Sequence, residues 1–71
     1  MNRKIMENKT LLFRIDEAGE RNHILLFPFG TEFCIYDHYT RRDMALRAAR
    51  DYAKKYDYEE VKEINGDYRS L

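Results

Sequence analysis

The sequence predicts an α+β fold in which a three-stranded antiparallel β-meander is followed by one amphipathic helix packed on one face of the sheet. Residues 10–37 contain short runs of Leu, Ile, Phe and Tyr interrupted at two places by glycine-containing turns, as expected for consecutive strands. Residues 41–56 then place alanines and tyrosines on one side of a helix and charged residues opposite. We therefore expect one domain over residues 10–65, with flexible tails at residues 1–9 and 66–71.

The two predicted turns set the pairing of the three strands. Both end in a glycine, which can take the positive φ that closes a three-residue hairpin loop, and the second also contains a proline with a suitable fixed φ. The first loop would place Asp16 opposite Glu20. The second would place Phe27 opposite Thr31.

These registers sort the strand side chains between two faces, because successive residues alternate and cross-strand pairs share a side. The first face is the predicted core and collects Leu11, Phe13, Ile15, His23, Leu25, Phe27, Phe33 and Ile35. The second face collects Leu12, Arg14, Asn22, Ile24, Leu26, Glu32, Cys34 and Tyr36. A slip of one residue in either turn would exchange part of these sets.

A helix is predicted to begin at Thr40, which forms a capping-box pattern with Asp43. A step of 100° per residue gathers its apolar side from Ala45, Leu46, Ala48, Ala49, Tyr52, Ala53 and Tyr56. The small alanines permit a close approach to the first face of the sheet. The tyrosines can bury their rings while their hydroxyls reach the edge.

The segment from Tyr58 to Ile64 has two interpretations. Val61 and Ile64 favour a short fourth strand, delivered parallel to an existing strand by a right-handed crossover to give the order β-β-β-α-β. The many charged residues of the segment would also suit a continuation of the helix.

The composition limits the classes of function. Thirteen basic and thirteen acidic residues give no net charge, so the footprint of a dedicated nucleic-acid binder is missing. Cys34 is the only cysteine, which excludes an internal disulfide and favours a reducing, cytoplasmic location. No apolar run approaches the roughly 20 residues that cross a bilayer, so no membrane partner is expected.

The sequence offers little for catalysis or metal binding. Ser70 is the only serine and lies in the predicted tail. Cys34 and His38 would lie about 13 Å apart along a strand, too far for proton transfer or a shared metal. His23, on the core face, is expected to be a buried neutral imidazole bonded to a carbonyl or a tyrosine. We expect a non-enzymatic protein without a cofactor or metal.

The second face carries an apolar patch that a single helix cannot cover. Large exposed patches of this kind usually meet a partner, although the tails or the fourth strand could also fold over this one. The sequence therefore predicts a small protein-interaction module or inhibitor that binds a larger protein, or a second copy of itself. The predicted contact residues are Leu12, Arg14, Ile24, Leu26, Glu32, Cys34 and Tyr36.

A second prediction comes from the segments Phe13–Arg21 and Thr40–Ala45, which resemble the arm-type DNA-binding domains attached to tyrosine recombinases. The resemblance covers residues 10–56 and implies that the exposed sheet face contacts DNA through Arg14, Asn22 and Tyr36. A cluster on the helix adds three candidate phosphate contacts, Arg41, Arg42 and Arg47. The sequence departs from the pattern at Leu12, Ile24, Leu26 and Glu32, where basic or polar residues would be expected.

Overall fold

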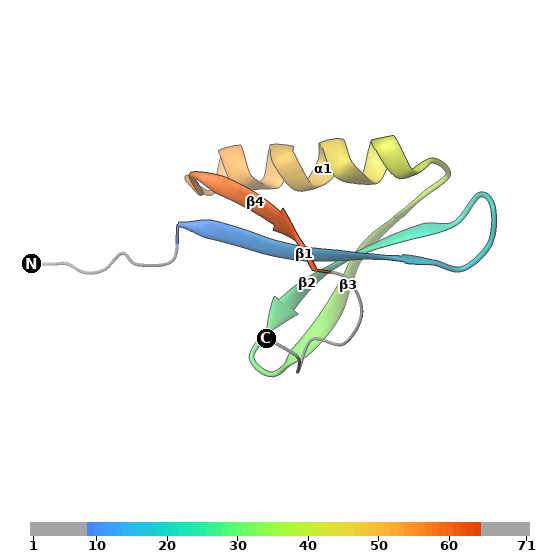
Figure 1. The fold of residues 1–71 in the computed structure, drawn as a ribbon, viewed down its shortest axis with the longest axis horizontal. Helices are drawn as coiled ribbons and strands as arrows, with labels where there is room; N and C mark the ends of the chain where they lie inside the picture. Colours follow the sequence, from blue (N-terminus) through green and yellow to red (C-terminus); the bar gives the residue numbers. More distant parts are fainter. Residues whose placement is uncertain (1–8, 65–71) are drawn as a thin grey trace, which may run out of the picture.

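The computed structural model describes residues 9–64, which form four strands and one helix (Figure 1). The predicted tails lie outside the described residues except for Lys9. The elements are β1 (Thr10–Glu17), β2 (His23–Phe29), β3 (Glu32–Tyr39), α1 (Arg42–Lys55) and β4 (Glu60–Glu63). The predicted α+β class and the β-β-β-α-β order are confirmed.

The four strands form one mixed sheet in the order β3-β2-β1-β4. The first three strands are antiparallel, and β4 lies parallel to β1 with Val61 opposite Leu11. Residues 60–63 are therefore a strand, which resolves the two interpretations of this segment in favour of the short fourth strand.

Helix α1 ends in a way that directs the chain back to β1. Asp57 takes a left-handed φ of 64°, and the Tyr58 N–H donates to the Ala53 carbonyl at 2.8 Å. These are the marks of a Schellman motif, which satisfies the last helical carbonyls. The Glu59 N–H then donates to the Lys9 carbonyl at 2.7 Å, beside the start of β1.

The first hairpin has a longer loop than predicted. Glu17 pairs with His23, so the loop comprises residues 18–22 and Asp16 lies opposite Ile24 rather than Glu20. This register sets Ile15 against Leu25, whereas the predicted one would have set it against an arginine. The shift is four residues, an even number, so every side chain of β1 and β2 keeps its predicted face.

The second hairpin has a shorter loop than predicted. Gly30, with a φ of 68°, and Thr31 form a two-residue loop, and Phe27 pairs with Cys34 instead of Thr31. Two-residue loops are favoured because their twist matches that of the strands. The shift along β3 is three residues, an odd number, so the predicted faces are exchanged.

This exchange corrects five predicted positions. Glu32 and Cys34 lie on the first face with their partners Phe29 and Phe27, whereas Phe33 and Ile35 lie on the second face opposite Pro28 and Leu26. A bulge follows, because Leu26 pairs with Ile35 but Leu25 pairs with Asp37, which leaves Tyr36 as the extra residue. The ring of Tyr36 contacts Phe27 and a helix tyrosine, so it also lies on the first face.

The core lies between the first face and α1, which covers that side of the sheet (Figure 1). Leu25, Ala45 and Ala49 are completely buried, and Phe13 and Ile15 complete the central cluster. The prediction that the alanines of the helix face the sheet is confirmed. Of the predicted helix stripe, only Tyr56 is largely exposed.

The predicted capping box is wrong. The helix begins at Arg42, its N-cap is Arg41, and no side chain caps it. The Asp43 carboxylate instead accepts two hydrogen bonds from the Arg41 guanidinium, at 3.1 and 2.8 Å. The Thr40 hydroxyl points to the sulfur of Met44 at 3.8 Å. Asp43 still stabilises the helix through its charge, because it lies in the first turn.

A first prediction concerns the close contact between the helix and the sheet. We expect Ala49→Leu to destabilise the fold by about 2 kcal/mol, because the larger side chain has no room at a fully buried position. Arg50→Leu is the control, since it places the same side chain on the exposed side of the helix. Urea unfolding of both variants measures the difference, and equal stabilities would contradict the close packing.

A second prediction concerns the start of the helix. The hydrogen bonds from Arg41 lower the pKa of the Asp43 carboxyl. The stabilisation from this carboxylate is thus present above its ordinary pKa and is lost as the pH falls through the lowered value. We expect Arg41→Ala to raise the pKa of Asp43 toward its ordinary value in an NMR titration of the carboxyl carbon. An unchanged titration would show that the pair does not form in solution.

Candidate interaction surface

Large exposed apolar side chains gather on the second hairpin. Phe29, Ile35 and Tyr36 are 79%, 58% and 51% exposed, and all three lie between the middle of β2 and the middle of β3. We call residues 27–36 the hairpin end. The other large apolar side chains of the described residues that are exposed, Met44 and Tyr56, lie at the two ends of α1.

On the second face, the hairpin end continues an apolar row across the sheet. Among residues 9–64, no helix or strand packs on this face. We call this row the outer patch, and it consists of Leu12, Ile24, Leu26, Phe33 and Ile35. Leu26 is buried between its cross-strand partners Arg14 and Ile35, so it forms the floor of the patch. The most accessible side chain of the patch is therefore Ile35, whereas Leu26, a predicted contact residue, is buried.

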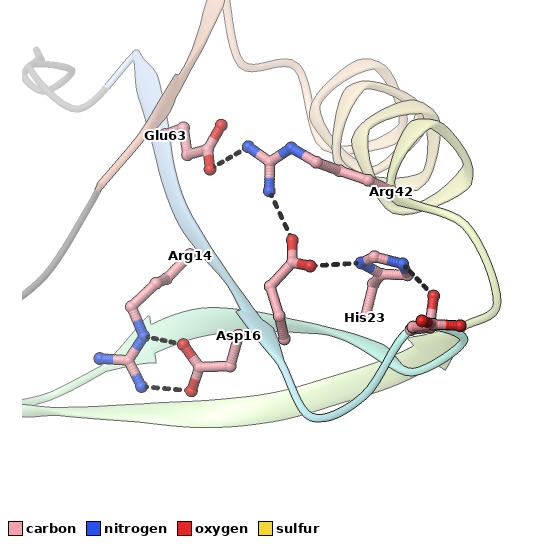
Figure 2. A network of polar contacts seen from close by, with 7 residues as sticks. Arg14, Asp16, His23, Arg42 and Glu63 are labelled. Carbon is pink, nitrogen blue, oxygen red and sulfur yellow. Dashed lines mark hydrogen bonds and ion pairs between the residues drawn. The ribbon is translucent and has the colours of Figure 1, made fainter.

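The outer patch has a polar border on β1. Arg14 donates two hydrogen bonds to the Asp16 carboxylate, at 2.9 and 3.0 Å, and Figure 2 shows the two side chains lying fork to fork. The guanidinium also lies 4.7 Å from the centre of the Phe33 ring, a cation–π arrangement. The charge of Arg14 is thus compensated by a carboxylate on the same face, which weakens it as a phosphate contact.

On the first face, the hairpin end joins an aromatic cluster with the last half of α1. Phe27 lies 4.4 Å from Tyr52 and 5.1 Å from Tyr36, measured between ring centres. Tyr56 extends the cluster at 4.6 Å from Tyr52. Burial, followed by the neighbouring tyrosines, raises the pKa of Tyr52 and keeps its hydroxyl protonated. The sequence placed Tyr52 correctly, but it put Tyr36 on the other face and so missed this contact.

A polar network lies at the opposite end of the sheet (Figure 2). Arg42 donates to the carboxylates of Glu63 and Glu17, the latter at 3.4 Å. The hydrogen bond from Arg42 to Glu63 is the main cause of the raised pKa of this guanidinium. Arg42 therefore ties the start of α1 to β1 and β4, and its charge is already compensated.

His23 is buried at the same end of the sheet, as predicted. Its Nε2–H donates to the Glu20 carbonyl at 3.2 Å, which is the bond to a carbonyl expected from the sequence. Nδ1 lies 3.2 Å from the Glu17 carboxylate but is not aligned for a hydrogen bond. Its cross-strand neighbours are Glu17 and Tyr39.

The other predicted nucleic-acid contacts do not converge on one surface. The Asn22 amide oxygen accepts from His38 Nδ1 at 3.1 Å on the second face, whereas Tyr36 lies on the first. Arg41 is paired with Asp43. Arg47 is exposed on α1 and lines a groove of about 350 Å³ with Arg41 and Arg50. Tyr36 therefore lies on the opposite side of the sheet from Arg14 and Asn22.

Residues 9–64 contain neither a cluster of metal-ligating side chains nor a helix that could span a membrane. No group of three or more His, Cys, Asp and Glu side chains among them is placed to hold a metal ion. Their single helix is too short and too polar to span a membrane.

Glu32, the last predicted partner contact, is exposed at the start of β3 opposite Phe29.

Comparison with known proteins adds no assignment, because no protein-family model, curated protein or solved structure matches this chain. The geometry of the described residues therefore carries the functional argument.

A third prediction concerns the network around Arg42. We expect Arg42→Ala to destabilise the fold by about 1 kcal/mol, because it removes charged hydrogen bonds that join α1 to two strands. Arg47→Ala is the matched control, since Arg47 is exposed on α1 and forms no ion pair with another residue of 9–64. Equal urea midpoints for the two variants would rule out a stabilising role for the network.

Proposed function

We propose that this chain is a small non-enzymatic protein-interaction module that binds a partner protein through the outer patch. The observation that carries the proposal is the exposure of Ile35, at 58%, at the β3 end of an apolar row on the side of the sheet opposite α1. Phe29, 79% exposed at the end of β2, adds an apolar side chain on the first face of the same hairpin.

The anatomy of the outer patch supports this role. Protein interfaces commonly combine an apolar centre with a polar rim, and here Ile35 and Phe33 are bordered by the Arg14–Asp16 pair. Burying the rest of an aliphatic side chain such as Ile35 contributes about 1 kcal/mol to binding. An arginine held by both a carboxylate and an aromatic ring is preorganised, so little side-chain entropy is lost on binding.

The placement of the reactive side chains supports a non-enzymatic role. Cys34 lies on the first face, and His38 lies on the second face opposite Ile24. The two most plausible members of a nucleophilic pair therefore point to opposite sides of the sheet. Contact of the sheet with DNA is less favoured, because Arg14 is paired with Asp16, and Asn22 and Tyr36 lie on different faces.

The fourth prediction tests this surface. We expect Ile35→Glu to reduce partner binding by at least about tenfold, because binding would bury an unpaired carboxylate. Met44→Glu is the control, since it places the same charge at an exposed apolar position on α1. The measurement is quantitative crosslinking and affinity capture from the native host, followed by titration of the partner that is lost with Ile35→Glu alone.

Circular dichroism of both variants should match that of the unchanged protein, because both positions are exposed. A partner that is retained by Ile35→Glu and lost with Met44→Glu would transfer the binding site to α1 and refute the proposal.

A further inference from the structure

A basic groove lies on the exposed side of α1. We call it the arginine groove; it has a volume of about 350 Å³ and is lined by Arg41, Asp43, Met44, Arg47 and Arg50. All five residues are exposed. Helix α1 covers the first face of the sheet, whereas the outer patch lies on the second face (Figure 1). The two surfaces are therefore on opposite sides of the sheet.

The arginine groove concentrates positive charge in a chain that carries no net charge. Three of its five residues are arginines and one is an aspartate, so two positive charges are in excess. The Arg41 guanidinium donates two hydrogen bonds to Asp43, which compensates its charge. Among residues 9–64, the side chains of Arg47 and Arg50 form no ion pair or hydrogen bond. The excess charge therefore belongs to these two arginines.

Arg47 and Arg50 are placed to act on one ligand. They lie three residues apart on α1, so their side chains project from the same side of the helix. The positive end of the helix dipole is already compensated by Asp43, which lies in the first turn. An anion is therefore expected beside the two guanidinium groups rather than at the start of the helix.

The positive charge is confined to the arginine groove. A second groove, of about 210 Å³, adjoins it, because Arg50 lines both. The second groove adds Lys54 but also Glu59 and Glu60, so its charges balance. A long polyanion that followed the helix would meet these carboxylates, whereas a compact anion would contact only the arginines. The charge pattern therefore favours a small ligand over a nucleic-acid strand.

We propose that the arginine groove binds a small phosphate monoester. A guanidinium carries parallel N–H donors that match two phosphate oxygens, so two such groups can hold one tetrahedral phosphate from two directions. A phosphate monoester carries about 1.5 to 2 negative charges at pH 7, which matches the excess charge of the groove. This site goes beyond the proposed function, because it uses none of the residues of the outer patch.

The size and lining of the groove also suit the organic part of such a ligand. Pockets for small molecules usually have volumes of about 300–1,000 Å³, and the arginine groove lies at the lower end of this range. Met44, which is 44% exposed, offers its thioether to an apolar or aromatic group. A small organic phosphate therefore fits the groove better than inorganic phosphate alone.

The test is an NMR titration of the full chain with adenosine 5′-monophosphate in a buffer without phosphate. We expect saturable shifts of the side-chain Nε–H resonances of Arg47 and Arg50, because these groups would donate to the phosphate. Adenosine is the matched control ligand, since it lacks only the phosphate, and it should not shift these resonances. No saturable shift at millimolar monophosphate, or equal binding of adenosine, overturns the inference.

Two variants test the arginines directly. Arg47→Gln and Arg50→Gln should each weaken monophosphate binding by about tenfold, because each removes hydrogen bonds between charged groups. Lys55→Gln is the matched control and should bind like the unchanged protein, since it removes one positive charge from α1 at a position that does not line the groove. Equal weakening by all three variants would show diffuse attraction and refute the site. Glutamine is a good helix former, so circular dichroism should show that each variant folds.

An oligonucleotide without a terminal phosphate distinguishes the small ligand from nucleic acid, because its backbone offers only phosphodiesters. We expect it to bind more weakly than the monophosphate. Tighter binding that is lost with Arg47→Gln would assign the groove to nucleic acid and refute the small ligand. Ile35→Glu should leave monophosphate binding unchanged, and Arg47→Gln should leave partner capture unchanged. The failure of either site therefore leaves the other standing.

Discussion

The contact between the alanines of α1 and the first face of the sheet organises the rest of the molecule. Ala45 and Ala49 allow the helix axis to approach Leu25 so closely that all three are excluded from solvent. A helix held at this distance ends above the start of β1, where the Schellman turn at Asp57 redirects the chain into β4. The Arg42 network then fastens the other end of the helix to the same two strands. One close contact thus sets the position of the fourth strand.

The same arrangement leaves the sheet asymmetric in two directions. Its first face is covered by α1, whereas no described element covers the second face; its β4 edge has four residues, whereas its β3 edge has eight. The uncovered face and the long edge strand meet at the hairpin end, where the exposed side chain of Ile35 belongs to the outer patch. A chain of this size has a thin core, so contact with another protein at this corner would add burial that the monomer cannot supply.

The face on which each strand side chain lies was predicted correctly only where the register shift was an even number of residues. The first loop is longer than its sequence suggested, yet Phe13, Ile15 and Leu25 keep their face because the shift is four residues. The register of β3 shifts by three residues, so Cys34 and Ile35 exchange faces and the centre of the surface moves. The signal that could have revealed this was Gly30, which suits a two-residue loop as well as a three-residue one.

The sequence by itself determined the type and order of the elements, the core residues of β1 and β2 and the apolar side of α1, because these follow from local periodicity and turn residues. Only the tertiary structure decided the register of β3, the bulge at Tyr36 and the residues that reach the surface. The reason is that competing hairpin loops satisfy the local chain almost equally well. The choice between them rests on contacts between distant residues, above all those of Tyr52 with Phe27 and Tyr36, which no local pattern records.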